Sequence, residues 1–339
     1  MSLARAAVSA DAAAEPLVSA AGLTKHFPIR EGLFGRSDRA VRAVEDVSFD
    51  IGPGEVLGVV GESGSGKSTL GRLVLRLIDP TAGRIRFMGR DLAAMRGAEL
   101  RRFRRHMQMI FQDPFASLNA RMTVGDALIE PLRLHRGLSG RQAEDAAVGL
   151  LRQVGLSPDH MRRYPRAFSG GQRQRIAIAR ALTPEPRFIV ADEPVSALDV
   201  SIQAEVVNLL QDLQRRLGLS LMFISHDLSV VELVADRVMV LYLGRVMETA
   251  PTGELYRRPA HPYTAALLQA VPGAKRRRER LLPRGEIPSP TNPPSGCVFR
   301  TRCPFAVRAC AENVPPLAPV GPGHFKACIR DEIRGELVA

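Results

Sequence analysis

A short loop rich in glycine and serine ends in a lysine and a hydroxyl group, which are groups that bind phosphate. The loop and the residue after it are Gly61, Glu62, Ser63, Gly64, Ser65, Gly66, Lys67, Ser68 and Thr69. The spacing fits G-x-x-x-x-G-K-[ST], in which backbone N–H groups surround the phosphates, Lys67 reaches the β- and γ-phosphates and Ser68 binds Mg²⁺. An apolar run at 56–60 precedes the loop and helically spaced leucines follow it at 67–78. This strand–loop–helix context predicts a site for ATP and Mg²⁺ rather than a chance Gly/Ser-rich turn.

Two adjacent carboxylates, Asp192 and Glu193, follow a second apolar run at 188–191. At a strand end, Asp192 can complete the Mg²⁺ shell with Ser68, and Glu193 can act as the base that orients the attacking water. An Asp-Glu pair after a strand is by itself more often a helix start or a solvated loop. The catalytic interpretation therefore depends on the phosphate loop in the same chain.

A Ser-Gly-Gly turn before a predicted helix at 172–182 offers a second anion site, because a helix N-terminus carries free N–H groups and partial positive charge. The turn consists of Ser169, Gly170, Gly171 and Gln172. Alone it could be an ordinary helix cap. Because Arg-rich sequence follows it and Asp192 comes soon after, it resembles the signature of ABC ATPases. In that family leucine more often stands at the position of Phe168, and phenylalanine keeps the apolar character.

The resemblance to ABC ATPases assigns roles to further residues. Gln112 matches the residue that senses the γ-phosphate, takes part in the Mg²⁺ site and touches the membrane subunit. His226, which ends an apolar run at 221–225, matches the switch histidine, so that Glu193, His226 and Gln112 form the implied catalytic set. Asp199 matches the loop that crosses the dimer interface. Phe27 is expected to stack on the adenine, with Phe34 as the alternative.

The resemblance also implies how the site is completed. In this family the signature and the phosphate loop of one subunit do not meet, and each signature closes over the ATP of the other subunit in a head-to-tail dimer. ATP joins the two subunits, and hydrolysis releases them. We expect a second, different ABC ATPase subunit as the partner, and residues 25–28 and 70–72 favour this chain being the second of that pair.

The order of apolar runs and helical patterns predicts an α/β fold. Strands that alternate with helices favour a parallel sheet, and the resemblance implies a P-loop NTPase core of the ABC ATPase type. Short runs between 22 and 60 predict an N-terminal antiparallel β part, and a helical subdomain is expected at about 105–170. We expect a disordered tail at 1–17, an ATPase domain at 18–270, and a C-terminal extension at 271–339 that begins with a basic, Pro-rich stretch and forms a small appendage.

Composition limits the classes of function. The 339 residues carry a net charge of +12, which suits either nucleic acid or work beside phosphate and lipid. Aromatic residues make up only 5% of the chain and show no stacking pattern, so nucleic acid is not expected as a partner. No run approaches the roughly 18 to 20 apolar residues that span a bilayer, and the first residues lack a signal-peptide pattern. A cytoplasmic protein is therefore expected.

Several short segments near the C-terminus show a narrower resemblance. They are His261-Pro262-Tyr263-Thr264, residues 285–290, residues 292–297, Arg302-Cys303-Pro304 and residues 324–328. Together they resemble the C-terminal region of bacterial dipeptide and oligopeptide importer ATPases. This implies a peripheral subunit on the cytoplasmic face of the inner membrane, two membrane permease subunits and, indirectly, an extracytoplasmic solute-binding protein. Nickel and other small-solute importers share parts of this region, and a soluble non-transport ABC ATPase is the more distant alternative.

The four cysteines, Cys297, Cys303, Cys310 and Cys328, all lie near the C-terminus. A cytosolic location disfavours two disulfides, and four thiols in a Pro-rich segment with little apolar material suggest a metal that holds the segment together. Zinc sites favour closer pairs and ferredoxin spacings do not match, so spacing leaves zinc, an iron–sulfur cluster and free thiols open. The resemblance to peptide-importer ATPases favours a [4Fe–4S] cluster with a structural role. Changing Cys303 is then expected to loosen the extension and to spare the ATP site.

Overall fold

The computed structural model describes residues 15–31, 35–113, 117–271 and 283–333. Most of the expected N-terminal tail, Phe34 and the basic run at 275–278 lie outside these residues. Leu17 already belongs to the fold, because its carbonyl accepts a hydrogen bond of 2.8 Å from the N–H of Met88. The fold therefore starts slightly before the boundary expected at residue 18.

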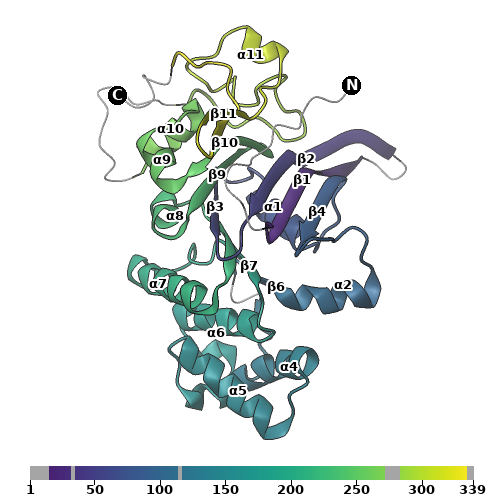
Figure 1. Cartoon of the computed structure of the whole chain (residues 1–339), viewed down its shortest axis with the longest axis vertical. Coiled ribbons are helices and arrows are strands. Elements are labelled where there is room, and N and C mark those ends of the chain that lie inside the picture. The colour runs from purple at the N-terminus through teal and green to yellow at the C-terminus, as the bar shows by residue number, and fades with distance from the viewer. Residues whose placement is uncertain (1–14, 32–34, 114–116, 272–282, 334–339) are drawn as a thin grey trace.

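A central eight-stranded sheet runs through the molecule (Figure 1), in the order β11-β12-β10-β9-β3-β8-β7-β6. Its strands are β3 Val56–Val60, β6 Met107–Ile110, β7 Phe188–Asp192, β8 Ser220–Ile224, β9 Arg237–Tyr242, β10 Arg245–Pro251, β11 Ala318–Gly321 and β12 His324–Lys326. From β9 to β6 the strands are parallel, whereas β9, β10, β12 and β11 pair antiparallel. β3, β7 and β8 are buried throughout, which explains why they read as unbroken apolar runs.

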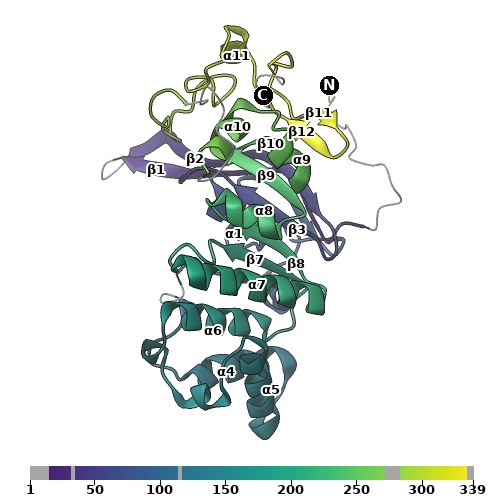
Figure 2. The same cartoon turned by 90° about the vertical axis from the view of Figure 1, so that its left-hand side faces the viewer.

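Both faces of this sheet are covered, as alternate residues of β3 show. Val56 and Val60 belong to one hydrophobic cluster, and Leu57 and Val59 belong to another. The first cluster includes residues of helices α6 Gly170–Leu182, α7 Val200–Leu217 and α8 Leu228–Val234. The second includes residues of α1 Lys67–Val74 and of the N-terminal sheet. In Figure 2 the helices α7 and α8 lie in front of the sheet, with α6 below α7 and α1 behind α8.

The antiparallel N-terminal part that the sequence predicted forms a separate four-stranded sheet, in the order β2-β1-β4-β5. Its strands are β1 Val18–Glu31, β2 Gly35–Ile51, β4 Ala82–Phe87 and β5 Arg90–Asp91. β1 and β2 make a long hairpin that extends beyond the body of the molecule (Figure 1). The run at 56–60 is not part of this sheet, because it pairs with β8 and β9 in the central one.

The helical subdomain lies at the end of the molecule opposite the C-terminal segment (Figures 1 and 2). It contains α4 Val124–Arg136, α5 Gly140–Gln153 and the 3-10 turns η2 Pro158–Arg162 and η3 Pro165–Ala167. Its expected start at about 105 is too early. β6 follows α2 Gly97–Phe103 and η1 Arg104–His106, and it pairs with β7 in the central sheet. The helical part therefore begins after residue 110.

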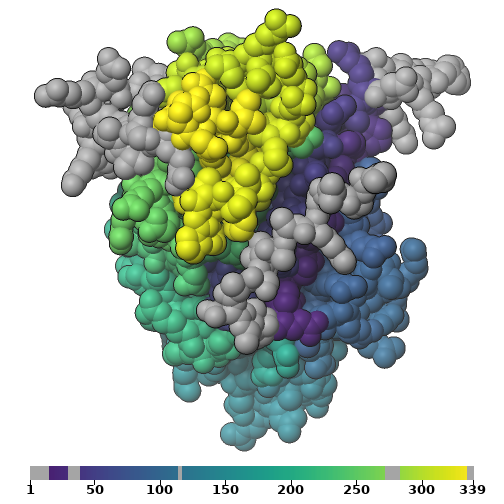
Figure 3. Space-filling model, turned by 45° about the horizontal axis from the view of Figure 1, so that its top comes forward, coloured from purple at the N-terminus to yellow at the C-terminus, as the bar shows by residue number. Residues whose placement is uncertain are grey.

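The C-terminal extension is not a separate appendage. It follows α9 Thr252–Arg257 and α10 Pro262–Gln269, and it contains α11 Ala309–Glu312 together with β11 and β12. β12 pairs with β10, and Val298 and Phe299 are buried in the main hydrophobic cluster. Figure 3 shows the segment, in yellow, beside the green C-terminal helices and the purple N-terminal strands. In the part of the chain that the structure describes, no helix is long and apolar enough to cross a membrane.

Candidate active site

Glycines fix the phosphate loop between β3 and α1. Gly66 is the N-cap of α1 and has a φ of 101°. A Cβ at this position would lie 2.1 Å from the carbonyl oxygen of Ala43, and a Cβ at Gly61 would lie 2.2 Å from that of Leu241. Neither position can hold a side chain, so the loop backbone packs closely against its neighbours and the first N–H groups of α1 are left for a phosphate.

Lys67 is buried inside the loop, with 5% of its surface exposed. Its Nζ donates to the carbonyl oxygens of Gly61 at 2.8 Å and Glu62 at 3.0 Å. Burial lowers the pKa of Lys67, and the nearby carboxylates, led by Glu193, raise it. Within the described residues the buried Oγ of Ser65 has no hydrogen-bond partner. A buried ammonium and an unpaired hydroxyl in a ring of backbone groups fit an anionic phosphate.

The predicted Mg²⁺ ligands Ser68 and Asp192 face each other, with the Ser68 Oγ donating to Asp192 Oδ1 at 2.7 Å. Burial raises the pKa of Asp192, and the hydrogen bond from Ser68 opposes this effect. Two oxygens beside the phosphate loop fit Mg²⁺, which takes oxygen ligands and neutralises charge on phosphates when it is bound.

The three implied catalytic side chains meet at one oxygen atom. Glu193 Oε2 lies 2.9 Å from Gln112 Nε2 and 3.2 Å from His226 Nδ1. Glu193 has a positive φ of 47°, and its N–H donates to the carbonyl of Ile224 at the end of β8. Such a strained backbone is typical of functional positions. Gln112 uses its amide nitrogen here, which leaves its amide oxygen for the predicted Mg²⁺ role.

The signature turn caps α6. The Oγ of Ser169 accepts from the N–H of Gln172, and the N–H of Ser169 donates back to the Gln172 side chain, which forms a capping box. A Cβ at Gly171 would lie 2.4 Å from Ile202, so the turn packs against the first turn of α7, whose N-cap is Asp199. Ser169 and Asp199 are both exposed. Among the described residues, the hydrogen bond of the Ser169 side chain stays within this cap and does not reach the phosphate loop.

The remaining predicted residues lie around the loop. Phe27 is 39% exposed on β1, and its strand partner is Val41. The Nζ of Lys25 lies 5.0 Å from the centre of its ring. An exposed aromatic ring on this strand suits an adenine, and that role stays a prediction. Ser63 is exposed in the loop, and Thr69 is half-buried in α1.

The four cysteines are free thiols that lie close to one another. Cys297 and Cys310 are buried, and every pair among the four interacts electrostatically. Burial raises the pKa of Cys297 to about 11 and of Cys303 to about 12. Backbone N–H groups two residues further along donate to three of the sulfurs, at Phe299, Phe305 and Arg330. In the described part of the chain, however, no three His, Cys, Asp or Glu side chains are arranged so that they could hold a metal ion.

Sequence reasoning missed two residues that contact the phosphate loop. The guanidinium of Arg302 donates to both carboxylate oxygens of Glu62, and the N–H of Glu62 donates to Tyr263 Oη. Arg302 and Tyr263 lie in segments that were noted only for their resemblance to the C-terminal region of peptide-importer ATPases. Nothing in the spacing of these two residues indicates a contact with the phosphate loop.

Two family patterns match the chain. Residues 44–196 match the ABC transporter family, and residues 247–310 match the C-terminal region of oligopeptide/dipeptide transporters. A Brucella ovis protein named as a candidate peptide import ATP-binding protein is 62% identical over 94% of this chain and 99% of its own length. The oligopeptide transport ATP-binding protein AppF of Bacillus subtilis is 52% identical over 93% of this chain and 97% of its own length.

Solved structures agree with this assignment. The dimeric, post-hydrolysis ATP-binding cassette MJ0796 bound to ADP and phosphate is 29% identical, with a TM-score of 0.62 over 69% of this chain and 98% of that one. The cbiO1 protein of Clostridium perfringens, part of the ABC transporter complex cbiONQ, is 26% identical, with a TM-score of 0.61 over 72% of this chain and 91% of that one. The phosphate loop and the acidic strand end lie side by side, as ATP hydrolysis requires. The chain is therefore an ATPase that belongs to the ATP-binding subunits of ABC transporters, in their oligopeptide/dipeptide branch.

Proposed function

We propose that this ATPase powers the uptake of peptides or related small solutes across the bacterial inner membrane. The observation that carries the proposal is the match of residues 247–310 to the C-terminal region of oligopeptide/dipeptide transporters. Relatives that share more than half of their residues with this chain are named for peptide import or oligopeptide transport. The solute itself would be chosen by other subunits, so a nickel or other small-solute importer is the alternative.

The proposed assembly is peripheral, at the cytoplasmic membrane face. Two permease subunits would form the path, and an extracytoplasmic binding protein would deliver the solute. A second ATPase subunit would complete the ATP site, since Ser169 and Asp199 are exposed and the hydrogen bonds of Ser169 stay within its own helix cap. The similar cassette MJ0796 is described as dimeric in a post-hydrolysis state.

In this chain Lys67 and the N–H groups at the start of α1 would bind the phosphates, and Ser68 and Asp192 would hold Mg²⁺. Glu193 would orient the attacking water and accept its proton, with Gln112 and His226 positioned on the same carboxylate oxygen. Hydrolysis would then depend on closure by the partner's signature.

Transport provides the direct test of the solute class. The chain is co-purified with its membrane subunits and placed in vesicles together with the binding protein. These vesicles should accumulate labelled oligopeptide only when ATP is present. The same complex carrying Glu193→Gln is the matched control and should accumulate none. Uptake of Ni²⁺ without peptide uptake would support the alternative, and a chain that never co-purifies with membrane subunits would contradict a transport role.

We further infer that Cys297, Cys303, Cys310 and Cys328 hold a [4Fe–4S] cluster that stabilises the extension. Two observations support the proposal: the proximity of the four thiols and the N–H groups directed at three of their sulfurs. A four-iron cluster is held by four cysteine thiolates, and hydrogen bonds to the sulfurs tune such clusters.

Metal analysis tests the cluster. Protein purified without oxygen should be brown, absorb broadly near about 400 nm and contain about four irons per chain. Cys303→Ser should remove colour and iron, because a ligand is lost. Thr301→Ala, an exposed neighbour, is the control and should retain both. A colourless protein that contains one zinc and no iron would contradict the cluster.

A further inference from the structure

The second residue of the phosphate loop is held by the C-terminal extension. Arg302 Nη1 lies 2.6 Å from Glu62 Oε2, and Nη2 lies 3.1 Å from Oε1, so the contact is bidentate. Only 9% of the Arg302 side chain and 25% of the Glu62 side chain are exposed. A charged, two-pronged hydrogen bond with little water access is among the stronger polar contacts in proteins.

The backbone of the same residue has a second anchor. The N–H of Glu62 donates to Tyr263 Oη at 2.9 Å. Tyr263 is fully buried in α10, and its ring packs 4.8 Å from that of Tyr242 and 5.2 Å from that of Phe299, measured between centroids. Arg302 lies over the Tyr242 ring as well. The packed rings of Tyr242, Tyr263 and Phe299, the last of which belongs to the extension, therefore hold both groups that bind Glu62, the Tyr263 hydroxyl and the Arg302 guanidinium.

Glu62 also carries the carbonyl that holds the phosphate-binding lysine. Its oxygen accepts from Lys67 Nζ at 3.0 Å and from the Ser65 N–H at 3.1 Å. Arg302 thus holds the side chain of Glu62, and the carbonyl of Glu62 orients Lys67 and Ser65. A shift of Glu62 would therefore move both of these residues, although Arg302 itself does not contact the nucleotide.

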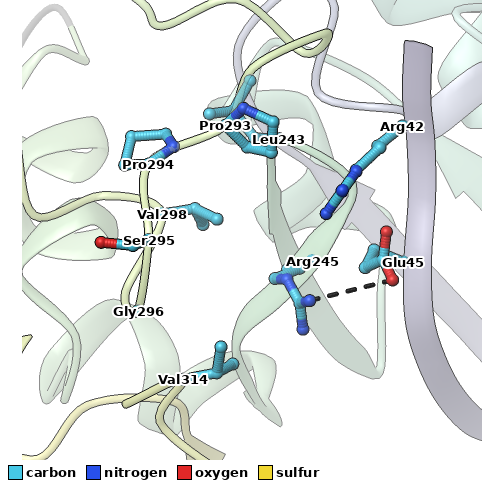
Figure 4. A pocket seen from close by; sticks show the side chains of 10 residues that line it. All are labelled: Arg42, Glu45, Leu243, Arg245, Pro293, Pro294, Ser295, Gly296, Val298 and Val314. Atoms are coloured by element: carbon cyan, nitrogen blue, oxygen red, sulfur yellow. Dashed lines mark ion pairs between the residues drawn. The ribbon is translucent and has the colours of Figure 1, made fainter. Parts of the chain in front are cut away.

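A second route joins the extension to the loop through β2 and the β9–β10 turn. The Arg42 N–H donates to the Pro290 carbonyl, the Glu45 N–H donates to Gly244, and the Gly244 N–H donates to Ser65. A cavity of about 170 Å³ lies along this contact (Figure 4). In it Arg42, Glu45 and Arg245 face the extension around Ser295, and Arg245 pairs with Glu45 across 3.9 Å. The extension therefore touches the framework of the loop from two sides.

Charge gives the direct contact a further role. Glu62 is an anion in a loop that must bind a triphosphate, and without a partner it would repel the phosphates. Arg302 neutralises it. Burial lowers the pKa of Arg302, but the hydrogen bonds to Glu62 and Tyr242 outweigh this and raise it, so the guanidinium stays charged.

We propose that Arg302 and Tyr263 are positioning residues for ATP, which make the C-terminal extension a working part of the nucleotide site. Arg302 holds and neutralises Glu62, and Tyr263 fixes its backbone, so that Lys67 and Ser65 are ready for the phosphates. The inference rests on the ATP site and not on which solute is transported. Failure of peptide uptake would leave it untouched.

The test measures ATP affinity of the full-length chain with a fluorescent ATP analogue and Mg²⁺. Arg302→Met should weaken binding by about tenfold, because Glu62 becomes an unpaired anion. Adding Glu62→Gln to Arg302→Met should restore most of the affinity, since the repulsion disappears. Arg308→Met is the matched control, because Arg308 lies in the same segment, is 95% exposed and pairs with Glu312 in a surface contact. It should bind ATP like wild type.

Turnover in the assembled complex separates positioning from general damage. Arg302→Met and Tyr263→Phe should raise KM for ATP and leave kcat within about twofold, because the catalytic carboxylate is not touched. Should Arg302→Met fold poorly, Arg302→Lys should give a smaller loss of affinity that Glu62→Gln again removes. The proposal is overturned if Arg302→Met binds ATP like Arg308→Met, if Glu62→Gln restores nothing, or if kcat falls while KM stays unchanged.

The contact also revises one expectation. Arg302 directly precedes Cys303, so Cys303→Ser should weaken ATP binding in the same assay and not spare it. Unchanged affinity in a Cys303→Ser chain with a loosened extension would show that the loop keeps its shape without this support.

Discussion

Glu193→Gln should lower ATP turnover at this chain's own site by about 100-fold or more while ATP binding persists. The amide keeps the size of the side chain and can still pair with Gln112 and His226, which both contact Oε2 of the carboxylate. It cannot accept a proton from water. Lys67, Ser68 and Asp192 are unchanged, so the phosphates and Mg²⁺ should bind as before.

The measurement compares phosphate release with binding of a fluorescent ATP analogue. Lys67→Ala is the contrast, because it removes the ammonium held inside the loop and should weaken binding itself. A Glu193→Gln complex that hydrolyses ATP near the wild-type rate would show that another group serves as the base. Lost binding in the same variant would instead point to a structural role for the carboxylate.

Three motifs of this site could be placed from sequence because each adjoins a short buried strand. β3 leads into the phosphate loop, β7 ends at Asp192 and β8 ends just before His226. Parallel strands end at the same edge of a sheet, so motifs far apart in sequence meet there. The structure adds that Glu193, Gln112 and His226 share one oxygen, a contact that spacing alone does not give.

Element boundaries were harder to predict, for local reasons. The leucine pattern suggested a helix at 67–78, but α1 ends at Val74. Arg76 takes a positive φ of 51°, and Leu77 is 44% exposed. β6 escaped notice because it has only four residues, and its apolar side chains are interrupted by Gln108. A run this short does not distinguish strand from helix.

The extension was misread as an appendage for a different reason. Its strands β11 and β12 are only four and three residues long, so they leave little pattern that could be detected in the sequence. Its stability comes from pairing with β10 and from the main core, which are long-range contacts. The same holds for Arg302 and Glu62, which are separated by 240 positions. No sequence pattern marks such a pair.

Ser169→Arg should disable the partner's ATP site and leave this chain's own site working. The exposed Ser169 at the tip of α6 would face the partner's nucleotide, and a long cation would block that approach. Loss of the helix cap would cost about 1 kcal/mol, which is small for a domain of this size. Ser139→Arg is the matched control, because Ser139 is an exposed N-cap on α5 without a side-chain cap bond. It should leave turnover unchanged.

Combining two changes in one chain decides whether the site is shared. If each signature acts on the other subunit, Ser169→Arg removes the partner's site and Glu193→Gln removes this chain's own. Either single variant should then retain at most roughly half of the turnover, and the double variant should retain almost none. If signature and base served one site in the same subunit, the double variant would be no worse than the more damaging single one.

The purified chain alone should be mainly monomeric and should hydrolyse ATP slowly, and its ATPase activity should rise when its partner subunits are added. Full activity from the isolated monomer would contradict the shared site.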